Sequence, residues 1–176
     1  MLTVEKFVVK GFDYLYLKNV EDCLIWTNFK GDPDKNFGKR GFSIDISKYP
    51  EVMEFFRQEG CNVRCWDNGK NDPVYTIAVN VDIDNSRFPC DFYNRRDDGK
   101  LIPMSRREIN ELDSQDFTYV DMKIREYHYT KGNGGVSLYL SKGSFAASVD
   151  PYDADHGDVL DMNAPMDEEE EEVPFE

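Results

Sequence analysis

The sequence lacks the motifs on which most enzyme active sites are built. It contains no Gly-rich phosphate loop ending in GK[ST], no G-x-S-x-G nucleophile elbow, and only two histidines in 176 residues. Carboxylates are paired at Asp82 with Asp84 and at Asp97 with Asp98, but in segments of turn-like composition. We therefore predict a protein without catalytic residues, metal or cofactor, and keep a small metal-dependent nuclease as an alternative.

Cysteines and long apolar runs are also scarce. The four cysteines form no C-x-x-C pair, and the chain does not begin like a signal peptide, so reduced core thiols are expected. Zinc held by Cys61, Cys65 and His128 is an alternative, although the spacing fits no common zinc motif. No apolar run approaches the ~20 residues of a membrane span. An intracellular protein without a membrane partner is therefore expected.

Basic residues are missing from one end of the chain. The formal net charge is -14, yet twelve of the 35 acids lie in residues 150–176, which contain no Lys or Arg. Residues 1–149 thus hold 23 acids against 21 bases. The acidic pI of 4.5 describes the end of the chain rather than its body, and it does not argue against nucleic-acid binding.

The apolar pattern that is present predicts a mainly β fold. Short runs rich in Val, Ile, Tyr, Phe and Trp are separated by Gly, Asp and Asn. The clear strands are Asp22 to Lys30, Arg40 to Ile46, Cys61 to Trp66, Val74 to Ile83, Phe117 to Tyr129 and Val136 to Leu140. One more is expected within residues 4–20, and residues 89–103 stay open between strand and loop. Antiparallel strands with helices only in their connections favour a small closed barrel.

Two short helices are predicted in those connections. Ser47 is placed to cap a helix that begins near Pro50 and ends before Gly60. In SRREINEL, Ser105 and Glu108 have the spacing of a capping box. The stretch KGNGG is expected to close a hairpin between the last two long strands.

The chain is predicted to divide into one domain and an acidic extension. A length of 176 residues suits a single domain, and apolar periodicity ends near Ser148. We assign residues 1–147 to the domain, 148–166 to a flexible linker and 167–176 to an acidic tail, with the extension disordered.

Side-chain alternation along the strands separates an aliphatic row from an aromatic and basic one. On residues 117–129, for example, Val120, Met122 and Ile124 share one face and leave Tyr, Lys and Arg on the other. Flat rings stack on unpaired bases and cations neutralise phosphates, so this pattern favours single-stranded nucleic acid. The alternative is that the rings fill a second side covered by a helix, or a barrel rim.

The predicted interface follows from these outward rows. Stacking is assigned to Trp26, Trp66, Tyr127, Tyr129 and Tyr139. Phosphate contacts are assigned to Lys30, Lys39, Arg40, Arg64, Lys123 and Arg125. The loop GDPDKNFGKRG, with Phe37 among its basic residues, is expected to be mobile and able to wrap a strand.

Taken together, the sequence resembles the single-stranded DNA-binding proteins of bacteriophages. Three core stretches are similar to strands of that family, NFGKRGFSIDI, EGCNVRCW and LDSQDFTYVDMKI, and the acidic end DEEEEEVPFE is the more specific feature. The resemblance implies an OB-fold domain that binds and protects single-stranded DNA in replication, recombination and repair. It also implies that the protein is not an enzyme and that it acts in the cytoplasm of a bacterial host. Whether it forms a homo-oligomer is left open.

The resemblance also implies a role for the acidic tail. In this family, acids followed by a Pro-Phe tip dock into basic pockets of replication and recombination proteins. The matching residues here are Asp167, Glu168, Glu169, Glu170, Glu171, Glu172, Pro174 and Phe175. Glu176 follows the tip, whereas bacterial members end on the Phe. The rival interpretation of the acids, a DNA mimic, requires them to be spread over the folded surface.

Overall fold

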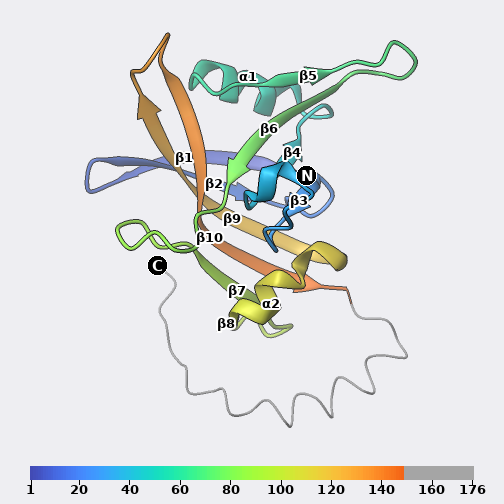
Figure 1. Ribbon diagram of the computed structural model, residues 1–176, viewed down its shortest axis with the longest axis vertical. Helices are drawn as coiled ribbons and strands as arrows, with labels where there is room; N and C mark the ends of the chain where they lie inside the picture. Colours follow the sequence, from blue (N-terminus) through green and yellow to red (C-terminus); the bar gives the residue numbers. More distant parts are fainter. Residues whose placement is uncertain (149–176) are drawn as a thin grey trace.

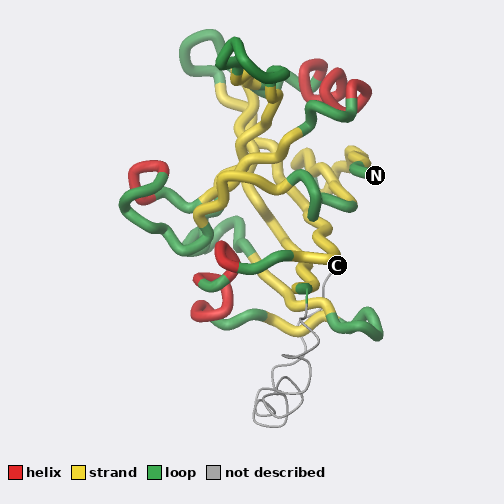
Figure 2. The backbone as a smooth tube through the Cα atoms, turned by 90° about the vertical axis from the view of Figure 1, so that its right-hand side faces the viewer, coloured by secondary structure: helices red, strands yellow, loops and turns green. Residues whose placement is uncertain are grey.

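A computed structural model describes residues 1–148 as one ten-stranded sheet with short helices at its periphery (Figures 1 and 2). The strands are β1 (Thr3–Val9), β2 (Phe12–Lys18), β3 (Leu24–Asn28), β4 (Gly41–Asp45), β5 (Arg64–Trp66), β6 (Val74–Asn80), β7 (Asp91–Arg95), β8 (Leu101–Pro103), β9 (Phe117–Tyr129) and β10 (Gly135–Ala147). The helices are α1 (Pro50–Gln58), α2 (Arg106–Asn110) and the 3-10 turns η1 (Asn36–Gly38) and η2 (Leu112–Ser114). The prediction of a mainly β fold with two short helices is confirmed.

The hairpin formed by β9 and β10 runs through the middle of the sheet. Each strand has 13 residues, and Gly132, Gly134 and Gly135 in and beside the turn have positive φ, as the KGNGG stretch predicts. A bulge at Ser141 in β10 shifts the register, because Leu140 pairs with Ile124 while Lys142 pairs with Lys123. The bulge keeps the inner and outer faces of both strands matched along their whole length.

The sheet is open, so the expected closed barrel is wrong. Its order is β1-β2-β9-β10-β6-β4-β3, and no pairing between described strands joins β1 to β3. One edge of β10 is shared between two parallel neighbours, β6 at Tyr139 and β7 from Lys142 to Phe145. Because β6 and β7 diverge from that edge (Figure 1), the sheet branches instead of closing.

The inner face of the curved sheet encloses one apolar core. Val120 and Ile124 of β9 are fully buried, which confirms the predicted inner row. Phe92 and Phe145 stack with ring centroids 5.9 Å apart, and Phe29 meets both rings edge-on at 5.9 Å. Residues from both ends of the sheet therefore belong to the same core even though its edges do not pair.

Several local predictions are confirmed and others are corrected. Ser105 and Glu108 form the capping box of α2, and α1 ends before Gly60. Ser47 does not cap α1, since its hydroxyl donates to Asp45 Oδ1 and accepts from Tyr75 N; no side chain caps that helix. Residues 4–20 contain parts of two strands rather than one, and residues 89–103 form β7 and β8.

The linker and tail predicted for residues 148–176 lie, from residue 149 onward, outside the described residues. Within residues 1–148, no helix is long and apolar enough to span a membrane. The division of the chain into domain, linker and tail remains a prediction.

Cysteine accessibility gives a direct test of this fold. Cys65 is exposed on β5, whereas Cys23, Cys61 and Cys90 are buried, and burial raises the pKa of Cys61 and of Cys90 to about 12. Thiolates are the reactive form, so one thiol per native chain should react rapidly with a disulfide reagent at neutral pH and all four after denaturation. The variant Cys65→Ser should remove the rapid phase, and a second rapid thiol in the native protein would contradict the fold.

Candidate nucleic-acid interface

The face of the sheet opposite the core, which we call the outer face, carries the predicted stacking residues and three of the six predicted cations. Strand register aligns Tyr14 of β2, Arg125 of β9, Tyr139 of β10 and Asn80 of β6 in one row across four strands. The next row places Tyr16 beside Lys123. Alternation along each strand therefore brings residues from distant parts of the sequence onto one surface.

A cluster of tyrosines and cations occupies the β2, β9 and β10 part of the outer face. Tyr127 and Tyr139 meet edge-on with centroids 6.4 Å apart, and Tyr127 is half exposed. The guanidinium of Arg125 lies 5.1 Å from the Tyr139 ring, and the Lys123 ammonium lies 4.7 Å from the Tyr14 ring. Cation–π contacts of this kind orient the rings, so the tyrosine edges and faces are held rather than freely rotating.

A pair of tryptophans occupies the other part of the outer face. Trp26 and Trp66 meet edge-on with centroids 5.3 Å apart, and they are 57% and 46% exposed. Trp26 has φ 51°, at the bulge between Ile25 and Asn28 in the pairing of β3 with β4. The Trp66 indole Nε1 donates to Thr76 Oγ1 at 2.9 Å. Large rings this exposed, yet fixed by a hydrogen bond and by each other, form a preorganised stacking surface.

Strand β6 connects the two aromatic clusters. Thr76, which holds Trp66, is followed on the same face by Ala78 and then by Asn80, which pairs with Tyr139. At about 3.3 Å per residue, Thr76 and Asn80 are roughly 13 Å apart. Ala78 and Asn80 are exposed, and the facing residue on β4, Ser43, is also small. The clusters are therefore linked by a strip of short side chains on which a chain could lie.

Beyond the tyrosine cluster, a small hollow of about 220 Å³ opens beside Arg95 and Tyr119. The Arg95 guanidinium lies 3.8 Å from the Tyr119 ring. Asp121 is buried in this region and accepts hydrogen bonds from the Tyr119 and Tyr16 hydroxyls and from Asn19 N. Burial, together with that carboxylate, raises the pKa of Tyr119, so the phenol stays protonated and keeps its bond to Asp121.

The cations predicted for phosphate contacts occupy different environments. Lys30, Lys39 and Arg64 are exposed, and Arg64 shares the outer face with Trp66. Arg40 instead donates to Phe29 O and to Asn110 Oδ1, and burial lowers its pKa. Its guanidinium thus connects residues 31–41, which we call the basic loop, to the end of α2.

Arg125 is 7% exposed and is covered by the Phe88 ring at 3.8 Å from its guanidinium. Because rings occupy the space around it, Arg125 positions Phe88 and Tyr139 and does not face solvent. Tyr129 stands apart from both clusters at the end of β9, where its ring packs beside Gly135.

The basic loop is organised by a residue at its base. The register pairs Asn28 with Gly41, on the row of the exposed Asn80, yet Asn28 is 2% exposed because the loop covers it. Its side-chain amide donates to the carbonyls of Asp32, Lys35 and Lys39, and its Oδ1 accepts from Asp32 N. The loop is therefore folded around Asn28, while Phe37 projects from it almost fully exposed. The mobility expected for this segment stays a prediction.

Several residues of the outer face were missed in the sequence. Tyr14 and Tyr16 lie in the first twenty residues, where the sequence predicted one strand in place of two. Arg95 lies within residues 89–103, which stayed open between strand and loop, and Phe88 lies just before them. The alternation of Tyr14 and Tyr16 with Leu15 and Leu17 was the available signal for β2.

The hydrogen bond to Trp66 can be tested by removing its acceptor. In a Trp26→Phe background, Trp66 is the only tryptophan, and Thr76→Val should lower its fluorescence anisotropy because the indole loses its anchor. The expected cost in unfolding free energy is about 1 kcal/mol. Thr118→Val, at the far end of β9, is the matched control, and equal anisotropy in both variants would show that the bond does not hold the ring.

Comparison with known proteins yields matches among solved structures. No family model matches the sequence, and no curated protein matches it. The single-stranded DNA-binding protein from bacteriophage Enc34 aligns with a TM-score of 0.47 and 12% identity over 86% of this chain and 93% of its own. Its C-terminal truncation aligns with a TM-score of 0.48 and 13% identity over 86% and 96%.

Proposed function

We propose that the outer face binds single-stranded DNA, largely without regard to base sequence. The observation that carries this proposal is the presence of two aromatic pairs on one face of the sheet, Trp26 with Trp66, both exposed, and Tyr127, half exposed, with the partly buried Tyr139. Bases of a single strand offer their flat faces to such rings, whereas bases in a duplex are already stacked and paired. Preference for the unpaired state shifts the melting equilibrium, so the protein protects single strands and opens hairpins.

Individual residues take different roles in this proposal. The two aromatic pairs stack on bases, and Tyr129 extends the stacking surface toward the hairpin end. Arg64 contacts phosphates beside the tryptophans, Lys39 does so from the basic loop, and Lys30 does so from the position just before it. Lys123 and Arg125 act mainly through the rings they hold, with the half-buried Lys123 ammonium adding positive charge.

Two other classes of function receive less support from the described residues. The aspartates considered for a nuclease are engaged in other contacts, since Asp84 pairs with Arg106 at 3.1 Å and Asp98 Oδ1 accepts from Lys100 N. A DNA mimic would present unbalanced acids across the folded surface, whereas here the 23 acids of residues 1–149 are nearly matched by 21 bases and the unbalanced acids lie beyond residue 149. The non-catalytic assignment and the OB-fold-like character of the curved, open sheet are parts of the same proposal.

The proposed role in the cell extends to partners and place. The acidic tail recruits replication or recombination proteins, steered by its charge and anchored by Phe175. The protein works in phage DNA replication, recombination and repair, in the cytoplasm of a bacterial host, and self-association remains open. These elements rest on the sequence of residues 167–176 and its resemblance to the phage family.

Titration with fluorescently labelled oligo-dT, with duplex as a control, tests the interface. Trp66→Ala should weaken single-strand binding by about 1 to 3 kcal/mol, because one stacked base is lost. Phe37→Ala removes a ring that is even more exposed but lies in the loop, and it should leave affinity nearly unchanged. Equal losses from both substitutions would place the contacts elsewhere than on the sheet.

Salt dependence separates stacking from phosphate contacts. Arg64→Gln should reduce the slope of log affinity against log salt concentration by about 0.7, the value for one phosphate contact on a single strand. Trp66→Ala should lower the affinity and leave that slope unchanged, because stacking releases no counterions. A slope unaffected by Arg64→Gln would remove this residue from the interface.

Deletion of residues 150–176 tests the acidic extension. We expect the deletion to tighten binding of single-stranded DNA at low salt, because twelve acids no longer compete with phosphates for the basic residues. The effect should disappear at high salt, where such competition is screened. Unchanged affinity of the deleted chain at low salt would refute autoinhibition by the extension.

A further inference from the structure

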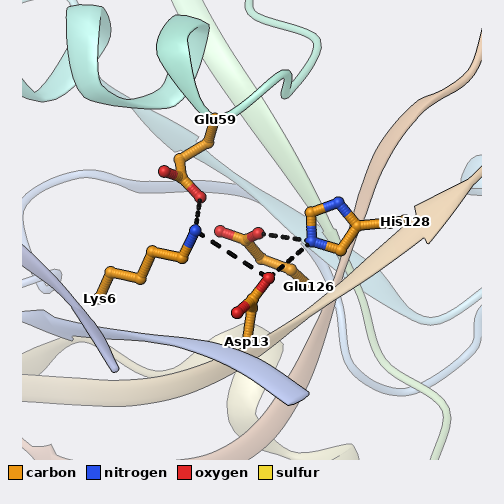
Figure 3. A network of polar contacts seen from close by, with 5 residues as sticks. All are labelled: Lys6, Asp13, Glu59, Glu126 and His128. Carbon is orange, nitrogen blue, oxygen red and sulfur yellow. Dashed lines mark hydrogen bonds and ion pairs between the residues drawn. The ribbon is translucent and has the colours of Figure 1, made fainter. Parts of the chain in front are cut away.

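A second group of convergent side chains lies away from the outer face, where the apolar core ends (Figure 3). Asp13 of β2 and Glu126 and His128 of β9 continue the inner rows of their strands beyond the last apolar residues, Leu15 and Ile124. His128 Nε2 lies 3.0 Å from Asp13 Oδ2 and 3.1 Å from Glu126 Oε1. One ring nitrogen thus faces two carboxylates from two strands.

Glu126 is the unusual member of this group. It is 2% exposed, and neither of its carboxylate oxygens accepts a hydrogen bond from the described residues, although a ring nitrogen lies close to one of them. A buried carboxylate without donors is costly, so the site calls for a cation or a proton at Glu126.

The nearby lysine does not fill that role. Lys6 Nζ lies 2.9 Å from Glu59 Oε1 and 4.0 Å from Asp13 Oδ2, and Figure 3 shows it directed at the Glu59 carboxylate. Its charge is therefore matched mainly by Glu59, and among residues 1–148 no Lys or Arg nitrogen lies within 4.0 Å of a Glu126 oxygen. A divalent cation would fill that place.

We propose that Asp13, Glu126 and His128 form a binding site for a divalent first-row transition metal ion such as Zn²⁺. Their nearest ligand atoms all lie within 4.8 Å of one another, and among residues 1–148 this is the one such cluster of three or more His, Cys, Asp or Glu side chains. Bonds of about 2.0 to 2.2 Å in a tetrahedral site place ligand atoms roughly 3.4 Å apart. The observed 3.0 and 3.1 Å separations are close to that spacing.

The ligand chemistry narrows the choice of ion. An imidazole with two carboxylates suits Zn²⁺, Mn²⁺ or Fe²⁺, whereas Mg²⁺ and Ca²⁺ take oxygen ligands. The His128 side chain is half exposed, which gives an ion access and leaves a coordination position toward solvent. The zinc alternative considered from the sequence, Cys61 and Cys65 with His128, shares only the histidine with this cluster, because neither cysteine belongs to it.

A metal at this position would join β2 to β9 at the end of the inner face. Tyr127 and Tyr129 flank His128 along β9 and point to the opposite side of the sheet. The bound ion therefore stabilises the strand ends that carry these rings without occupying the stacking surface. The site stands independently of the proposed function, because it depends only on inner-face residues.

Zn²⁺ titration into the full chain tests the proposal, using isothermal calorimetry and thermal unfolding. A Cys65→Ser background removes the exposed thiol as a competing ligand. The chain offers a matched pair of substitutions, since its only histidines are His128 and His156. We expect one site per chain, a higher unfolding midpoint with Zn²⁺, and at least about tenfold weaker binding in His128→Ala, with His156→Ala unchanged.

Glu126→Gln is the second variant, since it keeps the shape of the side chain and removes its charge. It should stay folded, by circular dichroism, and also bind Zn²⁺ at least about tenfold more weakly. Zn²⁺ binding that survives His128→Ala, or that is lost in His156→Ala instead, would overturn the proposal and place the ion on the acidic extension. Parental affinity in a folded Glu126→Gln variant would overturn it as well.

Discussion

The pairing of β9 with β10 is the constraint on which the rest of the structure depends. Two strands of 13 residues each, kept in step by the Ser141 bulge, supply one continuous inner face and one continuous outer face. β2 adds to one edge of this hairpin, and β6 and β7 add to the other. Because paired residues share a face, the register assigns each residue of a neighbouring strand to the inner or the outer face.

The two faces meet different physical demands. On the inner face, apolar burial stabilises the fold until the apolar residues end at Ile124, and beyond it the same row presents Glu126 and His128. On the outer face, aromatic rings are partly exposed to water, which is unfavourable. They are held in place by cations, by one another or, for Trp66, by a hydrogen bond to Thr76. A face of fixed rings loses little conformational entropy when a flat ligand stacks on it.

Much of this could be predicted from strand alternation, and the failures have identifiable causes. The inner row of β9 and the outward Trp66 and tyrosines follow from a period of two. Trp26 is different, because Leu24 pairs with the core residue Ile44 and the bulge after Ile25 changes the period. That bulge and the one at Ser141 escaped prediction because a bulge leaves no mark in composition. Arg125 was recognised as outward, but its burial depends on Phe88, a residue that comes from a distant loop.

The sequence by itself determined the strand-rich class, the hairpin at KGNGG, the capping box at Ser105 and which residues share a face, because these depend on neighbours a few positions apart. The tertiary structure alone decided that the sheet stays open, that Trp26 meets Trp66, and that Asp13 reaches Glu126. Those outcomes depend on register between strands far apart in the chain, and such pairings are selected by the packing of the whole core rather than by any local pattern.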